Sequence, residues 1–449
     1  HKPGEMAVYC NDGFSLAEMI VEKVSGKKFS DFLQERIFSP LALKNTGLGV
    51  GQLPSQSGVN IARYYDSAGR IDPLEVVSFL ASGGLSATAE DLCRFADSFS
   101  GKGPQILSSR SLAEMHKNQP TAFWGKLPRP TISLGLGWDF TSLPNFSAAG
   151  ITVMGKSGGT GNYTSMLFTV PEKRISVAVI GAGRSGRAME ISLKVLDAYL
   201  LQKGLLSNSA LQEPLTLPPT AEPIPDRLLA YEGYYAGDGG AILKLSMDAV
   251  NNNLTVFSTD PDQSGPLLIA TYNGGFFHDK EGKKYYLASV DGNRFFVNNT
   301  RLAEIILFQK IDPLESPQTL SLNVDGRRWL RRNVSPYEAR MSAPGHIATS
   351  RLLPELPGYL DFSGIKKITS PTTAGVSIAS VRDANELILF TEQNQVWAWV
   401  SGMIFMPSEQ ATPLQPGNNS IVISREDTNE WFKLNHNAIL GFSIPDKGR

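Results

Sequence analysis

A proline-rich stretch near the middle of the chain constrains its folding more than any other feature. Five prolines lie within it: Pro214, Pro218, Pro219, Pro223 and Pro225. Proline lacks a backbone N–H and has a fixed φ, so such a stretch is unsuited to a helix or a central strand. We therefore expect a linker over residues 207–225 that separates two regions with independent cores.

The region before the linker, residues 1–206, has the pattern of mixed helices and strands. Apolar residues recur at helical spacing in three segments: 14–24, 92–99 and 187–201. Three further segments are expected to be strands: 151–154, 163–170 and 175–180. The last two are joined by a short turn, Pro171 to Arg174, which makes that pair antiparallel. This pattern predicts an α+β domain.

The region after the linker has a different pattern, in which short apolar runs alternate with turn signals. Three such signals are clear: Asp238-Gly239-Gly240, Asn273-Gly274-Gly275 and Asp291-Gly292. Spacing of this kind is typical of antiparallel sandwiches and barrels. Glu232-Gly233-Tyr234 and Pro357-Gly358-Tyr359 each open a β-rich stretch. We therefore expect two antiparallel β domains, over residues 226–345 and 346–449.

Length, charge and histidine spacing exclude several classes of protein. The chain has 449 residues, which suits two or three domains, and its formal net charge is −1. A nearly neutral chain has no net electrostatic attraction for nucleic acid. No apolar run approaches the roughly eighteen residues needed for a membrane span. The five histidines show no ligand spacing, so neither a metal nor another cofactor is predicted.

Two short motifs carry groups that could act together in catalysis. Tyr9-Cys10-Asn11 lies at the start of the chain, and Lys156-Ser157-Gly158-Gly159 follows the expected strand at 151–154. A tyrosine phenol can move a proton, and a nearby lysine lowers the cost of a phenolate. Glycines on the strand let a substrate approach its backbone closely. A lone Tyr-x-Asn is usually a surface turn, so the order of the motifs along the chain decides its meaning.

Together these motifs resemble the Tyr-x-Asn and Lys-[Ser/Thr]-Gly signatures of the penicillin-binding-protein and serine β-lactamase superfamily. Further blocks occur in the family's order: Lys2-Pro3-Gly4-Glu5, Val24-Ser25-Gly26-Lys27, Ile37-Phe38-Ser39-Pro40-Leu41, Ser82 to Leu92, and Gly135-Leu136-Gly137-Trp138. The resemblance covers roughly residues 1–205. It implies a class C β-lactamase-like domain, in which an antiparallel sheet is flanked by helices.

The resemblance also implies a role for each motif residue. Tyr9 would be the proton shuttle, Asn11 would orient the substrate amide and the lysine, and Lys156 would be the electrostatic partner. Ser157 to Gly159 would bind substrate, and the N–H of Gly159 would stabilise the oxyanion. The reaction would pass through an acyl-enzyme on a peptide, amide or β-lactam-like substrate.

The nucleophile of such an enzyme is not found where the resemblance requires it. A Ser-x-x-Lys should lie several dozen residues before the tyrosine, but only eight residues precede Tyr9. The pattern occurs elsewhere at Ser25/Lys28 and Ser363/Lys366. The first ends a helix at a glycine cap and the second lies in the β-rich region, so we interpret both as chance matches. We therefore expect the nucleophile segment to be missing, removed or supplied by a separate N-terminal fragment.

Two glycine-rich matches to other catalytic motifs fail on context. Gly155 to Gly159 has the Gly-x-Ser-x-Gly spacing of a nucleophile elbow, but a strand rather than a helix follows it. Gly181 to Gly186 has the Gly-x-Gly-x-x-Gly spacing of a dinucleotide site. The strand before it is expected to be antiparallel to its neighbour, which does not suit dinucleotide binding.

The expected three-domain arrangement resembles that of D-stereospecific aminopeptidases of the superfamily, which also have two C-terminal β-barrel (lipocalin-like) domains. Those relatives commonly have histidine where this chain has Lys156. The difference favours a carboxypeptidase-like or β-lactam-like substrate, because lysine can bind a substrate carboxylate. Two alternatives stay open: an esterase of the same fold, and a non-catalytic protein that binds peptidoglycan-like peptides. The resemblance also implies an exported or periplasmic location.

Overall fold

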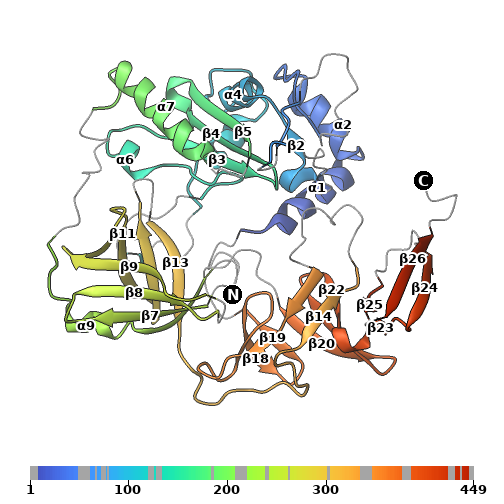
Figure 1. Ribbon diagram of the computed structural model, residues 1–449. Helices are drawn as coiled ribbons and strands as arrows, with labels where there is room; N and C mark the ends of the chain where they lie inside the picture. The colour runs from blue at the N-terminus through green and yellow to red at the C-terminus, as the bar shows by residue number, and fades with distance from the viewer. Residues whose placement is uncertain are drawn as a thin grey trace. The chain divides into compact units, whose positions relative to one another are not determined.

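The structure is a computed structural model of the chain, coloured from the N-terminus to the C-terminus in Figure 1. It describes residues 9–48, 61–65, 68–71, 77, 80–119, 126–127, 134–183, 187–207, 220–237, 242–260, 263–300, 304–333, 346–376, 386–422, 430–434 and 437–443. The predicted succession of an α+β domain and two antiparallel β domains is confirmed. None of the helices in these ranges is both long enough and apolar enough to cross a membrane.

The N-terminal domain combines short helices with a small antiparallel sheet. Its helices are α1 Asn11–Ser25, α2 Phe29–Leu33, α3 Leu80–Gly83, α4 Ala89–Asp97, α5 Ser109–Met115, α6 Pro144–Ser147 and α7 Ala188–Gln202. Its strands are β1 Gly47–Leu48, β2 Leu85–Ser86, β3 Met154–Gly159, β4 Tyr163–Val170 and β5 Ile175–Ala182. Strands β3, β4 and β5 form one sheet in that order, and both pairs are antiparallel.

Helices α7 and α4 cover opposite faces of this sheet (Figure 1). Successive side chains of a strand point to opposite faces, so β4 supplies both cores. Met166 and Phe168 are buried in the cluster that contains residues of α7. Leu167, between them, is buried in the cluster that contains Ala96 of α4 and Phe99 just beyond it. The sheet is therefore the rigid layer on which any site at its edges is built.

Of the three strands predicted in this domain, two are confirmed and one lies further along the chain than predicted. Strand β4 has the predicted bounds, and β5 continues two residues beyond the predicted end, to Ala182. The predicted strand at 151–154 is wrong in position, because β3 begins at Met154 and runs through Gly159. Pairing with β4 extends over the whole of 154–159 and defines the strand there. The connecting turn is a 3₁₀ turn that ends at Arg174, with φ of 55°.

Helix α1 confirms the helical spacing predicted over 14–24. It ends at Gly26, whose φ of 67° and N–H bond to the Glu22 carbonyl make a left-handed cap. Its apolar side chains are nonetheless largely exposed: Phe14 is 43% exposed, Ile20 54% and Val24 83%. Among the described residues, no α1 side chain is classed as buried. Helix α1 therefore has the predicted apolar face, but among the described residues this face is not buried in a core.

The first β domain is a closed eight-stranded barrel. Its strands are β6 Gly233–Gly237, β7 Ile242–Asp248, β8 Asn253–Ser258, β9 Pro266–Asn273, β10 Phe276–Asp279, β11 Lys284–Val290, β12 Asn293–Asn299 and β13 Glu304–Ile311, and the short helix α9 Asp226–Leu229 precedes them. Two predicted turns join neighbouring strands, at Gly274-Gly275 and Asp291-Gly292. All four residues have positive φ, as tight hairpins require. The signal at 238–240 lies outside the described residues.

The second β domain is a nine-stranded antiparallel sheet that comes close to a barrel. Its strands are β14 Arg328–Arg331, β15 Ile347–Thr349, β16 Arg351–Leu352, β17 Tyr359–Asp361, β18 Ile365–Ser370, β19 Thr373–Gly375, β20 Leu387–Glu392, β21 Gln395–Val400 and β22 Met403–Pro407. The two edge strands, β15 and β16, are separated in sequence by Ser350 alone, so the sheet curls back on itself. Trp329, Phe362 and Phe405 are at most 1% exposed and form ring contacts in its core.

One predicted boundary does not match this sheet. Strand β14 precedes the boundary predicted between residues 345 and 346, yet it pairs with β15 and β22 of the nine-stranded sheet. The predicted boundary separates β14 from its sheet because pairing between strands far apart in the chain produces no local sequence pattern. Beyond the sheet, β23 Thr412–Pro413 pairs with β25 Phe432–Lys433, and β24 Gly417–Val422 with β26 Ala438–Ser443. The other predicted boundaries, and most of the linker at 207–225, lie in or beside residues that are not described, and they stay predictions.

Candidate functional site

The motif Lys156-Ser157-Gly158-Gly159 forms the second part of β3, at an edge of the three-stranded sheet. In an antiparallel pair, alternate residues direct their N–H and C=O groups to opposite sides. Gly155 exchanges backbone hydrogen bonds with Phe140, at 2.9 and 3.1 Å, on the side away from β4. Gly159 stands four residues further along the same strand. Its N–H therefore points to this outer edge, as the predicted oxyanion role requires.

Asp139 binds the motif from outside the strand. Its Oδ2 accepts hydrogen bonds from the Ser157 backbone N–H at 2.7 Å and from the Ser157 hydroxyl at 2.5 Å. The Lys156 ammonium lies 3.2 Å from Oδ1 and 3.4 Å from Oδ2. The structure thus brings Lys156, Ser157 and Asp139 together in one cluster. Sequence analysis predicted the first two and missed the aspartate.

The segment before Asp139 explains how the carboxylate reaches β3. Gly135 donates its N–H to the Trp138 carbonyl at 3.0 Å, and Gly137 takes a φ of 78° within this turn. Trp138 and Phe140 on either side of the aspartate are buried, 5% and 7% exposed. They anchor the loop, and the carboxylate between them faces β3. The Gly135–Trp138 block recognised in the sequence stops one residue short of Asp139, and that adjacency was the available signal.

Lys156 is neither buried nor fully free. Its side chain is 35% exposed and that of Asp139 is 23% exposed. The ammonium also donates to the Ser157 carbonyl at 2.6 Å. A charge-assisted pair of this exposure keeps contact with solvent.

The two glycines of the motif serve different purposes. A Cβ added to Gly158 would lie 2.4 Å from the Ser165 hydroxyl oxygen on β4. A Cβ added to Gly159 would meet no atom within 4 Å. A side chain at Gly158 would therefore require the Ser165 hydroxyl to rotate away. Only at Gly159 does the glycine leave open space beside the strand edge, where a substrate could approach the backbone.

Tyr9 and Asn11 lie on a different element. Tyr9 is 45% exposed and immediately precedes Cys10, the N-cap residue of α1, and Asn11 is the first residue of that helix. The predicted motif is therefore placed at a helix start, where side chains project from a defined backbone. The proton-shuttle role of Tyr9 and the orienting role of Asn11 stay predictions.

Neither Ser-x-x-Lys match in the chain forms a reaction site. Ser25 is the last residue of α1, and its hydroxyl accepts the Lys27 N–H at 3.2 Å in the turn that follows the helix. Ser363 lies in the tight connection between β17 and β18, with φ of 49°. Lys366 is 1% exposed, and burial lowers the pKa of its ammonium to about 8. A lysine enclosed in a core cannot serve a substrate, which supports the interpretation of the second match as chance; the interpretation of the first stays a prediction.

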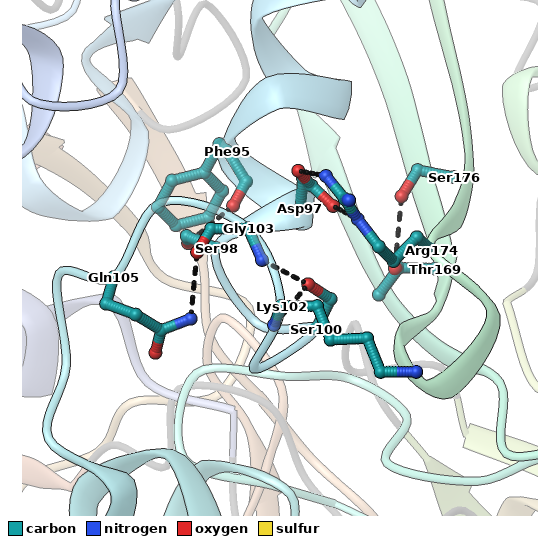
Figure 2. A network of polar contacts seen from close by, with 10 residues as sticks. All are labelled: Phe95, Asp97, Ser98, Ser100, Lys102, Gly103, Gln105, Thr169, Arg174 and Ser176. Carbon is teal, nitrogen blue, oxygen red and sulfur yellow. Dashed lines mark hydrogen bonds and ion pairs between the residues drawn. The ribbon is translucent and has the colours of Figure 1, made fainter.

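A second polar network lies where α4 meets the β4–β5 turn, and Figure 2 shows it. Arg174 makes a bidentate ion pair with Asp97, at 2.8 and 2.5 Å, and holds the pKa of that carboxyl below its usual range. Ser176 and Cys93 line an open depression beside the pair. Burial raises the pKa of the Cys93 thiol, so the nucleophilic thiolate is disfavoured. The network is best explained as a structural ion pair that holds α4 against the β4–β5 turn.

Two other kinds of site, a metal site and a dinucleotide site, gain no support from the described residues. Within them no cluster of histidine, cysteine and acidic side chains could hold a metal ion. His1 and His436 lie outside the described ranges. Strand β5, which precedes the glycine-rich match at 181–186, is antiparallel to β4. A dinucleotide site of that motif requires a parallel sheet, and the antiparallel pairing of β5 with β4 therefore does not suit dinucleotide binding.

Comparisons with known proteins give matches to the N-terminal region of the chain. Residues 1–199 match the family model described as Beta-lactamase. Penicillin-binding protein 4 of Amycolatopsis lactamdurans is 24% identical over 254 residues, which cover 53% of this chain and 62% of that protein. D-aminopeptidase of Brucella canis is 23% identical over 201 residues, which cover 44% of this chain and 36% of that protein.

Among solved structures, the octameric penicillin-binding protein homologue from Pyrococcus abyssi is 23% identical, with a TM-score of 0.41, over 69% of this chain and 66% of that one. A TM-score of this size is too low to bear on the arrangement of the present chain. The chain spans less than two thirds of the length of the two relatives above. The family match nonetheless includes the start of α1, the three-stranded sheet and the Lys156 edge. Residues 1–199 are thus a domain of the β-lactamase family, to which penicillin-binding proteins are related.

Proposed function

We propose that this protein is a serine hydrolase of the penicillin-binding-protein type, which cleaves an amide or peptide bond through an acyl-enzyme. The observation that carries the proposal is the outer edge of β3. There Lys156 supplies a positive charge and the N–H of Gly159 points away from β4. Such donors at an open strand edge suit the negative oxygen of a tetrahedral intermediate.

The proposed reaction uses groups of this chain around a serine that lies outside residues 1–449. The serine oxygen attacks the substrate carbonyl, and its proton passes through the phenol of Tyr9 to the departing amine. Asn11 orients the substrate, and Lys156 favours the anionic form of the tyrosine by its charge. Water then attacks the ester carbonyl, one of its protons passes through the phenol of Tyr9 to the serine oxygen, and the acid is released.

The names of related proteins support the choice of substrate class. One relative, from Escherichia coli, is described as a D-alanyl-D-alanine-carboxypeptidase/endopeptidase, and another as a D-aminopeptidase. We therefore propose peptides or amides with a D-residue beside the scissile bond as substrates. An esterase reaction on the same site would use the same charges and the same oxyanion N–H, and it stays the second candidate.

Denaturing mass spectrometry of the native protein tests the proposal. The protein is isolated from its source and treated with a fluorophosphonate, which phosphonylates active serines with loss of fluoride and does not need a substrate carboxylate. We expect the probe mass on a polypeptide that includes or accompanies residues 1–449, at a serine outside them. The Lys156→Ala variant should label at least about tenfold more slowly, since the electrostatic support is lost.

Two results would count against this function. An adduct on a serine within residues 1–449 would show that the nucleophile has been misplaced. Absence of any adduct in the native protein would favour the alternative of a binding protein without catalysis.

A further inference from the structure

We propose that Asp139 is a specificity residue: its carboxylate already occupies the donors that a substrate carboxylate would need, so the site selects substrates that are uncharged beside the scissile bond. The inference rests on the proposed function and narrows its substrate class to amides, esters and internal peptide bonds. It also reverses the preference drawn from Lys156 alone, which favoured a carboxypeptidase-like or β-lactam-like substrate.

The first step of the argument is the number of donors around Asp139. Oδ2 receives the Ser157 N–H at 2.7 Å and the Ser157 hydroxyl at 2.5 Å, and the Lys156 ammonium lies within 3.4 Å of the same oxygen. Oδ1 lies 3.2 Å from that ammonium. An ammonium, a hydroxyl and a backbone N–H that converge in this way form a carboxylate-binding site. In this protein the carboxylate in that site belongs to the chain itself.

The second step is charge. Asp139 lies against the Lys156 ammonium, so a substrate carboxylate directed at these same donors meets little net positive charge. A substrate carboxylate that approached Lys156 would also meet the negative charge of Asp139, and like charges at this range repel. The pair is partly screened, because the side chains are 35% and 23% exposed. A neutral amide or ester meets no such repulsion.

The third step is rigidity, because a mobile aspartate could turn away and leave the donors to a ligand. Trp138 and Phe140 are buried on either side of Asp139, and Phe140 exchanges two backbone hydrogen bonds with Gly155. The loop is therefore joined to β3 one residue away from the carboxylate. Beyond Ser157 the strand edge remains open at Gly159, where a Cβ would meet no atom within 4 Å. A neutral carbonyl can reach the strand there without displacing Asp139.

The experiment uses two acyl-D-dipeptide substrates that are identical except for a free C-terminal carboxylate or a primary amide. With the wild-type native protein, we expect kcat/KM to be at least about tenfold higher for the amide. Asp139→Asn keeps the size of the side chain and removes its charge. It should raise the relative kcat/KM of the carboxylate substrate by about tenfold, and it should change the amide substrate much less.

Glu90→Gln provides the control, because it removes one negative charge from an exposed pair with Arg94 on α4. It should leave the ratio of the two substrates unchanged. A wild-type preference for the free carboxylate would overturn the inference, and so would an unchanged ratio in Asp139→Asn. The wild-type ratio decides the matter even if Asp139→Asn does not fold.

Binding separates this inference from the proposed hydrolysis. If neither substrate is cleaved, the dissociation constants of the same two ligands are measured by calorimetry on the wild type and on Asp139→Asn. Tighter binding of the amide, with a reversal in the variant, would support the inference and remove the hydrolase function. Equal binding of the two ligands, or binding of neither, would overturn the inference.

Discussion

Lys156 and Lys366 each lie near an aspartate, and the contrast between these two lysines shows what distinguishes the candidate site. Lys156 lies at the edge of the N-terminal sheet beside Asp139, and its side chain is 35% exposed. Lys366 lies in β18 of the nine-stranded sheet near Asp361, and it is 1% exposed. Lys366 has the Ser-x-x-Lys spacing of a catalytic lysine, and Lys156 does not. Access to the strand edge, rather than motif spacing, therefore separates the candidate site from the chance match.

The two surroundings change the lysines in different ways. Around Lys366, burial disfavours the charged ammonium and lowers its pKa to about 8, although Asp361 acts in the opposite direction. Burial also raises the pKa of the Asp361 carboxyl. Lys156 keeps solvent contact and an open strand beside it. A buried pair of this kind contributes to the structure of one sheet, whereas the partly exposed pair lies beside an open strand edge.

The largest expected effect is the loss of stability when each lysine is replaced by alanine. Lys366→Ala leaves a cavity and takes the cation away from Asp361, so we expect the free energy of unfolding of that sheet to fall by about 4 kcal/mol. Lys156→Ala should lower it by less than about 1 kcal/mol, because the pair is partly exposed. Urea denaturation followed by tryptophan fluorescence measures both, and fluorophosphonate labelling should show the reverse order. Equal losses of stability would mean that the two pairs have the same role.

A smaller effect is expected in the dependence of the free energy of unfolding on pH. Lys366 has an ordinary pKa of 10.5 when unfolded and about 8 when folded. Between these values the unfolded chain binds a proton that the folded chain has released. Stability should therefore rise from pH 8 to 10.5, by an amount on the order of 3 kcal/mol.

Urea midpoints across that pH range measure the rise. Lys366→Met fills a similar volume without charge and should abolish it, whereas Lys156→Met should retain it. A wild-type stability that is flat or falls over this range would show that burial does not suppress the charge of Lys366.

The smallest expected effect concerns Ser363, the serine of the chance match. Its φ of 49° is unfavourable for a residue with a Cβ, and Gly364 beside it has a φ of 105°. Ser363→Gly should raise the free energy of unfolding by about 0.5 kcal/mol through relief of this strain. Thermal unfolding checks the gain, and Ser363→Ala should show none. If either variant abolished labelling by the fluorophosphonate, Ser363 would have to be considered as the nucleophile.

Local patterns were sufficient for much of the fold. The turn at 171–174 follows from a four-residue connection between two apolar runs, and the glycine at 26 ends α1 as a cap. The hairpin at Asp291-Gly292 has positive φ at both residues, which the sequence signal requires. These features depend on backbone preferences within a few residues, and so a single sequence reveals them.

The local patterns of the sequence were enough to predict that a mixed α+β domain precedes β domains and that the glycine-containing motif Lys156 to Gly159 comes directly after a strand. Pairing with β4 carries that strand through the motif, and tertiary contacts alone set which groups lie against its edge. Asp139 reaches Lys156 because Phe140 pairs with Gly155, and β14 joins a sheet whose other strands follow it in the chain. Such contacts depend on loop closure and on packing between residues that are far apart in the chain. The spacing of neighbouring residues therefore does not predict them.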